Sequence, residues 1–285
     1  MTINALYRKF LEELKAIYPS GESAKITQMV FESLAGMSRS DVIKTPEKLI
    51  SVEDSHRLTA ALDMLLANMP VQYVIGETCF FNLTFKTTRD VLIPRPETEE
   101  LVEEVIKYLQ SNPQQKKILD IGTGSGCIPI AIQKNTVHHK MVSIDISEAA
   151  IQIATENALL HQTEISFMQI DFLHVEKRNT LDLYDVIVSN PPYIPGNEMP
   201  SIEKHVKHYE PLNALFVPEK QPLLFYEAIL QFSVEHLATG GKIFMEIHED
   251  FGQEVARIFK ENKFEVDLKK DIFGKDRIAI ASLYP

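Results

Sequence analysis

The sequence predicts an α/β protein with a mostly parallel sheet, preceded by a small all-α domain. Three observations support this fold class. Between residues 117 and 189, short apolar runs alternate with helical stretches, as they do around a parallel sheet. The first run is followed by a glycine-rich segment, residues 122–126, where α/β proteins place a ligand-binding loop. Residues 1–75, in contrast, show helical spacing and no clear strand pattern.

The composition is that of an ordinary globular protein, and its charge disfavours one class of substrate. The chain has 285 residues, 45% of them hydrophobic, and a net charge of −11. A protein that grips a nucleic-acid backbone usually has a basic face, so the acidic balance favours a protein or small-molecule substrate. Cys79 and Cys127 are the only cysteines, and no apolar run approaches the roughly 18 residues of a membrane helix. We therefore expect a cytoplasmic protein without a membrane segment.

Residues 1–75 are predicted to form a small helical domain. Leu6, Phe10 and Leu14 lie on one face of a first helix, and further helical stretches follow at residues 25–34, from residue 38, and at residues 51–67. Ser51, with Asp54 three residues later, has the pattern of a helix start. Nothing in this domain indicates catalysis. Its role is either structural or the docking of a macromolecular partner.

The segment that follows has β-prone residues and is predicted to link two domains. The pattern changes at residue 71, includes Tyr73 and Val74, and is broken by Gly76 and Asn82, which favours a β-hairpin. We assign residues 76–94 to this linker and residues 95–285 to a second domain.

The second domain is predicted to begin with an extended segment and a helix. Prolines on both sides hold Arg95 extended, so its guanidinium either guards the mouth of a cleft or is only a surface charge. Thr98 is the expected N-cap of the helix that follows.

The remaining elements complete the predicted sheet. We expect strands at residues 117–121, 141–145, 165–170, 185–189 and 242–247, with helices between them that include one capped by Ser147. A helix at residues 251–262 precedes a terminal hairpin of residues 264–271 and 277–283. Strands separated by helices pair in parallel and bind ligands at their carboxyl ends.

The glycine loop indicates the kind of ligand. Gly122, Gly124 and Gly126 let the backbone approach a ligand at a helix N-terminus. The dinucleotide pattern G-x-G-x-x-G is absent, because residue 127 is cysteine. The tighter G-x-G-x-G spacing is the form seen with S-adenosylmethionine.

Acidic residues follow successive strands of the predicted sheet. Asp120, Asp145 and Asp171 lie at the ends of the first three strands and are predicted to line one edge of a single cleft. Asp145 is placed to accept both ribose hydroxyls, and Asp171 to accept from an adenine amino group with Phe172 against the ring. Asp120 is expected to orient the loop or to meet the ammonium group of the ligand. Helix caps or turn residues are the alternative interpretation of all three.

The segment Asn190-Pro191-Pro192-Tyr193 ends the fourth predicted strand. Two prolines remove two backbone donors, and Asn190 is kept out of the helical region because it precedes proline. The segment therefore offers carbonyl groups, an amide and a flat aromatic face, which together suit a planar amide or amine nitrogen. A simple turn is the alternative.

These motifs together resemble a class I S-adenosylmethionine-dependent methyltransferase. Two further segments are more specific: Pro-Val-Gln-Tyr-Val-Ile-Gly at residues 70–76 and Val-Leu-Ile-Pro-Arg-Pro-Glu-Thr-Glu at residues 91–99. They resemble the HemK/PrmC family of peptide chain release factor N5-glutamine methyltransferases. The resemblance implies a Rossmann-like domain with a mixed, mostly parallel, seven-stranded sheet, a β-hairpin linker, and a helical domain that docks the release factor. We expect a monomer that binds neither nucleic acid nor a metal.

The resemblance also implies the residues of the site. The residues expected to contact S-adenosylmethionine are Gly122, Thr123, Gly124, Ser125, Gly126, Asp145, Asp171, Phe172 and Asn190. Those expected to hold the substrate amide are Asn190, Pro191, Pro192 and Tyr193, of which Asn190, Pro191 and Tyr193 are the expected catalytic residues. One departure affects residues 216–222, where the family usually has a glycine-rich turn and this chain has Phe-Val-Pro-Glu-Lys-Gln-Pro.

Two other functions compete with this interpretation. The same Asn-Pro-Pro-Tyr segment holds the exocyclic amine of adenine in DNA methyltransferases, which makes a DNA adenine or an RNA methyltransferase the main alternative. A nucleotide-binding module without activity would keep the glycine loop and Asp145, but it would have no need for Asn190.

Overall fold

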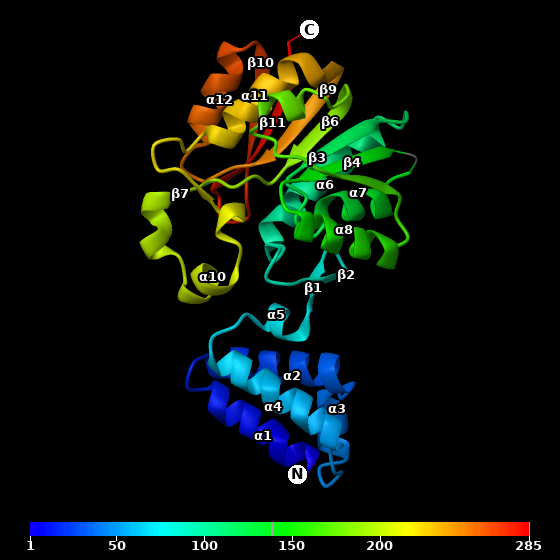
Figure 1. The fold of residues 1–285 in the computed structure, drawn as a ribbon, viewed down its shortest axis with the longest axis vertical. Helices are drawn as coiled ribbons and strands as arrows, with labels where there is room; N and C mark the ends of the chain where they lie inside the picture. The colour runs from blue at the N-terminus through cyan, green and yellow to red at the C-terminus, as the bar shows by residue number, and fades with distance from the viewer. Residues whose placement is uncertain (138, 285) are drawn as a thin grey trace. The chain divides into compact units, whose positions relative to one another are not determined.

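The computed structural model describes residues 1–137 and 139–284, which form two compact units. Unit 1 comprises Met1–Glu77 together with Glu203–Tyr209, and unit 2 comprises Thr78–Ile202 and Glu210–Pro285. Figure 1 labels the elements of each unit. No helix within the described residues is both long enough and apolar enough to cross a membrane.

Unit 1 is all helical. Its helices are α1 (Ile3–Leu14), α2 (Ser20–Ala35), α3 (Arg39–Lys44), α4 (Val52–Leu66), α5 (Val71–Ile75) and α10 (Lys204–Tyr209). Ser51 caps α4 by accepting from the Asp54 backbone N–H, as the sequence predicts, and Ser38 forms a capping box with Asp41 at α3. The predicted apolar stripe of α1 is buried in a core shared with α2 and α4.

The prediction that β structure begins at residue 71, just before the assigned linker, is wrong. Tyr73 and Val74 lie in α5, a five-residue helix that begins after Pro70 and ends at Gly76. Gly76 has φ +78°, the left-handed conformation in which glycine commonly ends a helix. These two flanking residues outweigh the β propensity of the short segment between them.

Helix α10 belongs to unit 1, although the chain on either side of it belongs to unit 2. The Tyr209 hydroxyl donates to the Ala67 carbonyl at 2.7 Å, just after the end of α4. The sequence offers no signal for this long-range contact.

The predicted hairpin is formed by β1 (Glu77–Phe80) and β2 (Leu83–Lys86). Its two connecting residues, Phe81 and Asn82, have φ of +50° and +59°, which suit a tight two-residue hairpin turn. The rings of Phe80 and Phe85 are buried against helices of unit 2, so the hairpin is packed and not merely a tether.

The seven-stranded sheet of unit 2 has the order β10-β11-β9-β6-β3-β4-β5. The strands are β3 (Lys117–Ile121), β4 (Lys140–Asp145), β5 (Ile165–Gln169), β6 (Tyr184–Ser189), β9 (Leu237–Glu246), β10 (Phe264–Lys270) and β11 (Asp276–Leu283). Five strands pair in parallel, and β11 runs antiparallel to both of its neighbours. The predicted fold class, a mixed and mostly parallel sheet, is confirmed.

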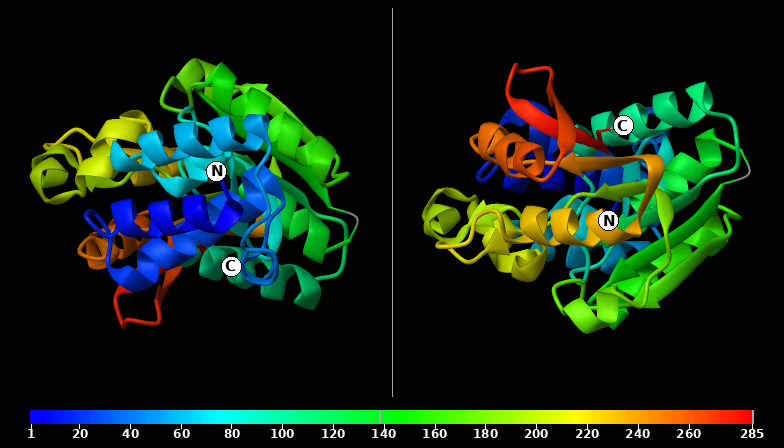
Figure 2. Two further views of the ribbon diagram at one scale, coloured as in Figure 1. Left: turned by 90° about the horizontal axis from the view of Figure 1, so that it is seen from below. Right: turned by 90° about the horizontal axis from the view of Figure 1, so that it is seen from above.

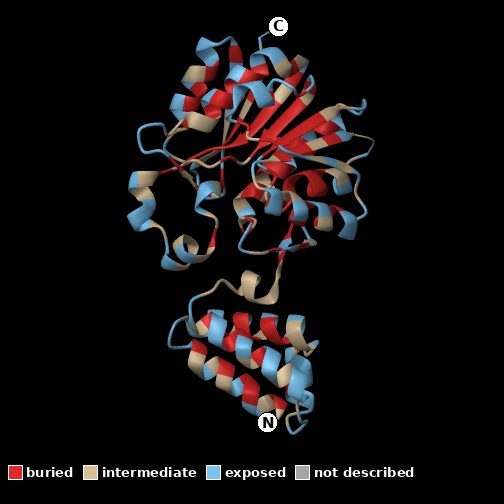
Figure 3. Cartoon of the chain, in the orientation of Figure 1, coloured by how far each residue is buried: buried red, intermediate tan, exposed pale blue. Residues whose placement is uncertain are grey.

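Helices cover both faces of this sheet, as Figures 1 and 2 show. One face packs on α11 (Leu224–His236) and α12 (Gly252–Glu261). The other face packs on α6 (Pro96–Ser111), α7 (Cys127–Asn135) and α8 (Glu148–Leu160). The central strands β3 and β6 are buried along most of their length (Figure 3), which explains their apolar runs, whereas the edge strands β5 and β10 are mostly exposed or half-buried.

The order of the strands places the site. From β3 the chain adds β4 and then β5 on one side, and later returns to add β6 on the other side of β3. Ligands bind outside the carboxyl ends of the strands at such a switch point. Ile121 and Ser189 are register partners, so the glycine loop after β3 and Asn190 after β6 leave the sheet side by side.

Short elements connect these strands and helices. They are α9 (Val175–Arg178), β7 (Ile194–Pro195), the 3-10 helices η1 (Gly196–Ser201) and η2 (Leu212–Ala214), and β8 (Phe216–Val217). Strand β8 pairs in parallel with β7, so the segment that departs from the family pattern begins as a short strand.

Candidate active site

A cavity of about 590 Å³ lies at the switch point of the unit 2 sheet. Eight of the residues that line it were predicted for the site from the sequence, among them Gly122, Gly124, Asp145, Asp171 and Asn190. Most of the remaining lining is apolar, which is the usual character of a small-molecule site. The lining from the second half of the chain includes Pro191, Pro192, Phe216, Pro218 and Phe225.

The three loop glycines have different surroundings. All have positive φ, but only Gly122 and Gly124 line the cavity. A Cβ at Gly124 would have no neighbour within 4 Å, so this position is open on the side of the cavity. A Cβ at Gly126 would lie 3.1 Å from the Ala154 Cβ, so this glycine allows α7 and α8 to pack closely.

Asp145 joins the glycine loop to the end of β4. One carboxylate oxygen accepts from the Gly124 N–H and the other from the Ser147 N–H, both at 2.9 Å. Burial raises the pKa of Asp145, more than these backbone donors lower it. Each oxygen keeps a lone pair for a ligand, so the carboxylate can hold the loop and accept further hydrogen bonds.

Asp171 and Phe172 lie on the same cavity wall. Asp171 accepts from the Leu173 N–H at 3.0 Å, and the buried Phe172 packs edge-on against Phe232. Behind them, the buried Arg178 donates to the Phe172 carbonyl at 3.4 Å, and its guanidinium lies 5.5 Å from the Phe172 ring centroid. Arg178 therefore fixes both the backbone and the ring of Phe172.

Asp120 is placed differently from the sequence prediction. It is fully buried on the α7 side of the sheet, and it is not among the described residues that line the cavity. Burial raises its pKa to about 7, more than the nearby Thr123 and Ser143 hydroxyls lower it. The prediction that three carboxylates line one edge is wrong for Asp120, whereas its expected role in orienting the loop stays a prediction.

Asn190 and Tyr193 are held by residues that the sequence analysis did not select. The Asn190 Nδ2 donates to the Thr98 hydroxyl at 3.0 Å, and the Tyr193 hydroxyl donates to Glu246 at 3.0 Å. Thr98 also donates to the other oxygen of Glu246 at 2.7 Å. Thr98 is thus not the predicted N-cap: α6 begins at Pro96, and the Thr98 hydroxyl is used inside the site.

Arg95 pairs with a buried carboxylate. Its Nη2 lies 2.6 Å from an oxygen of Glu210, a side chain only 1% exposed. Glu210 also accepts from the Ile93 N–H at 3.4 Å, and its neighbour Pro211 lines the cavity. Of the two interpretations of Arg95, the plain surface charge is therefore wrong, and Arg95 anchors Glu210 next to the cavity-lining Pro211.

Comparison with known proteins assigns the chain to a family. The PrmC N-terminal domain family matches residues 5–76, and the methyltransferase small domain family matches residues 100–207. The release factor glutamine methyltransferase of Flavobacterium psychrophilum is 37% identical over 281 residues, or 98% of each chain. The enzyme of the same name from Bacteroides thetaiotaomicron is 36% identical over 98% of this chain and 100% of its own. The chain belongs to the release factor glutamine methyltransferase family.

The resemblance stated from the sequence is thereby confirmed. A solved structure, the hMettl16 catalytic domain in complex with the MAT2A 3'UTR hairpin 6, has a TM-score of 0.55 at 13% identity. It covers 82% of this chain and 83% of that one, and at this identity it supports the fold alone.

The residues predicted for the site of this family member fall into two groups. The residues that line the cavity are Gly122, Gly124, Asp145, Asp171, Phe172, Asn190, Pro191 and Pro192. The residues placed behind this lining are Thr123, Ser125, Gly126 and Tyr193. Thr123 and Ser125 are buried beneath the loop, and Tyr193 points to Glu246.

Proposed function

We propose that this chain transfers a methyl group from S-adenosylmethionine to the side-chain nitrogen N5 of the glutamine in the Gly-Gly-Gln motif of bacterial peptide chain release factors. One structural observation supports the proposal in addition to membership of the family. Asn190 and Pro191 line the same cavity as Gly122, Gly124 and Asp145, so the proposed amide clamp and the proposed methyl-donor site share one space.

The residues of the cavity fit the methyl donor. The open side of Gly124 admits a ligand against the backbone, and a side chain there would fill this space. Asp145 would accept from the ribose hydroxyls, while Asp171 and Phe172 would meet the adenine. S-adenosylmethionine supplies an activated methyl group bound to a positively charged sulfur.

The substrate nitrogen needs help because an amide lone pair is delocalised into its carbonyl. With Asn190 Nδ2 committed to Thr98, Asn190 Oδ1 is left to accept a substrate N–H. The Pro191 carbonyl would accept the second N–H. These two acceptors would fix the nitrogen and stabilise the positive charge that develops on it, while Tyr193, behind the lining, would support Asn190 and Pro191. Preorganised acceptors and positioning would supply most of the acceleration.

A labelled-transfer assay tests the substrate. The enzyme is incubated with S-adenosyl-[methyl-³H]methionine and either a purified bacterial release factor, DNA or RNA. We expect label only in the release factor, and none when the motif glutamine is changed to alanine. Label found only in nucleic acid would instead support the adenine methyltransferase alternative.

The amide clamp has a separate test. We expect Asn190→Ala to lower turnover at least about 100-fold, since one acceptor for the developing charge is lost. Affinity for S-adenosylmethionine, measured by calorimetry, should change little. Near wild-type turnover by a folded Asn190→Ala variant would refute the clamp.

The enzyme is further proposed to act as a monomer in the cytoplasm, with the release factor as its partner. The free thiols of Cys79 and Cys127 agree with a reducing compartment. Sedimentation of the purified protein tests the monomer.

A further inference from the structure

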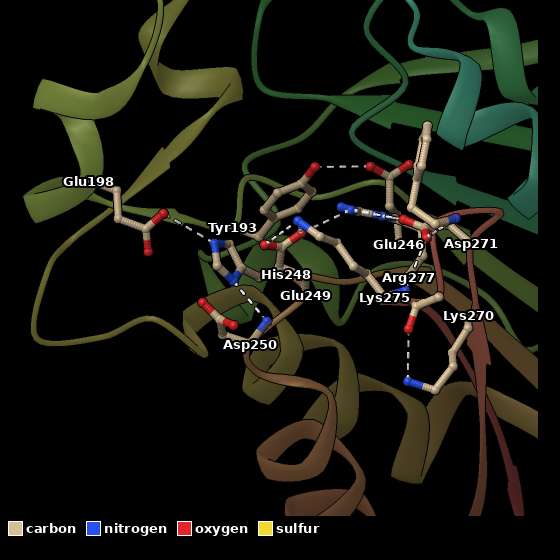
Figure 4. Close-up of polar contacts among 12 residues, drawn as sticks. Tyr193, Glu198, Glu246, His248, Glu249, Asp250, Lys270, Asp271, Lys275 and Arg277 are labelled. Atoms are coloured by element: carbon tan, nitrogen blue, oxygen red, sulfur yellow. Dashed lines mark hydrogen bonds and ion pairs between the residues drawn. The ribbon is translucent and has the colours of Figure 1, made fainter.

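A buried carboxylate joins both ends of the Asn-Pro-Pro-Tyr segment. Glu246 is the last residue of β9 and is 1% exposed. One of its oxygens accepts from the Tyr193 hydroxyl, and the other accepts from the Thr98 hydroxyl, which in turn accepts from Asn190 Nδ2. Figure 4 shows the first of these links, with the Tyr193 hydroxyl directed at Glu246 and Arg277 beside it.

We propose that Glu246 is a positioning residue whose carboxylate fixes the direction of these hydrogen bonds, so that Asn190 presents its oxygen, and not its NH₂ group, to the substrate. This inference rests on the proposed function, in which Asn190 accepts a hydrogen bond from the substrate amide.

The direction of the hydrogen bonds between Glu246, Thr98 and Asn190 follows from the number of protons that each group can donate. An ionised carboxylate only accepts, and a threonine hydroxyl has a single proton to donate. Thr98 is buried and gives that proton to Glu246, so towards Asn190 its oxygen can only accept. Asn190 must then turn Nδ2 to Thr98 and leave Oδ1 for the cavity. With a hydrogen-bond donor in place of the carboxylate, Thr98 would be released to donate to Asn190, and the amide would turn round.

The surroundings fix the position of Glu246 and act on its charge in opposite directions. Its backbone pairs with Ile278 in register, and its carbonyl accepts from the Tyr226 hydroxyl at 3.4 Å. Burial raises the pKa of Glu246, and the nearby Glu97 adds to this. The Thr98 and Tyr193 hydroxyls and the Arg277 cation oppose it by stabilising the ionised form.

The first test needs no substrate. In the ¹H–¹⁵N correlation spectrum of the wild-type enzyme, one side-chain N–H of Asn190 should show a downfield proton shift and slow exchange with solvent, because it is hydrogen-bonded to Thr98. Asn190→Asp identifies the resonance by its loss. Glu246→Met, which offers Thr98 no acceptor and so releases its proton to Asn190, and Thr98→Val should both abolish this signature, and Thr98→Ser should restore it. An unchanged signature in folded Glu246→Met would overturn the proposal.

The second test measures methyl transfer to a purified release factor. We expect Glu246→Met and Thr98→Val each to lower kcat roughly 10- to 100-fold, the loss of one aligned charge-assisted hydrogen bond, with S-adenosylmethionine affinity retained. Because both act through Asn190, the double variant should lose little more than either one. If the two losses in kcat were fully additive, the proposed chain of hydrogen bonds from Glu246 to Asn190 would be contradicted.

Glu97→Gln is the matched control. It removes the same charge from the neighbourhood of Glu246 but lies outside the hydrogen-bond chain. Its kcat should stay within about threefold of wild type, and a loss as large as that of Glu246→Met would assign the effect to charge alone. If the wild type shows the amide signature but transfers no label to the release factor, the proposed function fails while the positioning role stands.

Discussion

Replacing Gly126 by alanine should destabilise the fold far more than the same change at Gly124. Both residues have positive φ, +78° at Gly126 and +53° at Gly124, so both variants meet the same kind of backbone strain. Only at Gly126 does the new Cβ also meet neighbours, with the Ala154 Cα and the Ile130 Cδ1 each at 3.2 Å. Comparing the two variants therefore separates the cost of steric crowding from the cost of backbone strain.

The magnitude follows from these two contributions. A non-glycine residue in the left-handed region costs about 1–2 kcal/mol. Alanine recovers about 0.4–1 kcal/mol of this by restricting the unfolded chain, equally in both variants. Crowding between α7 and α8 adds about 1–3 kcal/mol at Gly126, because Ala154 belongs to a packed helix that cannot easily shift. The difference between the variants should thus be about 1–3 kcal/mol.

Urea unfolding followed by circular dichroism measures this difference, and calorimetry measures S-adenosylmethionine binding. Gly124→Ala should be the more stable variant, but it should bind the methyl donor at least about tenfold more weakly, because its Cβ enters the cavity. Equal stability of the two variants would refute the packing role of Gly126. Unchanged binding by Gly124→Ala would refute the placement of the methyl donor at this loop.

Three further predictions concern buried polar side chains of unit 2. Asp145→Ala should weaken S-adenosylmethionine binding by roughly 10²- to 10⁴-fold, because two charge-assisted hydrogen bonds are lost. A change of less than threefold in the Kd measured by calorimetry would show that Asp145 does not bind the methyl donor. The pKa of Asp120 is raised to about 7 from 3.8, so its proton favours the folded state, and stability should fall by about 4 kcal/mol as pH rises from 4 through 7. Unfolding free energies at pH 5 and pH 8 should show this decline in the wild type and a flatter profile in Asp120→Asn. The Asn157 side chain forms hydrogen bonds with the N–H and carbonyl of Lys86 and with the carbonyl of Ser125. Asn157→Ala should therefore lower the free energy of unfolding in urea by about 2–4 kcal/mol. The exposed control Asn262→Ala loses one hydrogen bond to its own helix and should lower it by less than about 1 kcal/mol.

The central strands of the unit 2 sheet are readable from the sequence because they are buried on both faces. β3 and β6 therefore appear as apolar runs, and β3 begins and ends at the predicted residues. Helix α5 is missed because five residues are too few for a periodic pattern. Its flanking Pro70 and Gly76 were the available signal.

The lining of the site is predicted better than its support. Gly124, Asp145 and Asn190 belong to local motifs, and local motifs are visible in one sequence. Thr98 and Glu246 are 148 residues apart, so their pairing depends on the fold. A signal for Glu246 did exist, since a carboxylate at the end of a parallel strand is the same pattern that selected Asp145. For Thr98, Pro96 at the first helical position argues against an N-cap assignment.

The place of α10 affects the order in which the chain can fold during synthesis. Helices α1 to α5 leave the ribosome first, but their unit also includes Glu203–Tyr209. The hydrogen bond from Tyr209 to Ala67 spans 142 residues, so it cannot form until most of the unit 2 sheet has been synthesised. Such long-range closure is slow compared with local helix packing. The helical unit can therefore start to fold before unit 2, but it is completed only after β3 to β6 have been synthesised, with β9 to β11 still to follow.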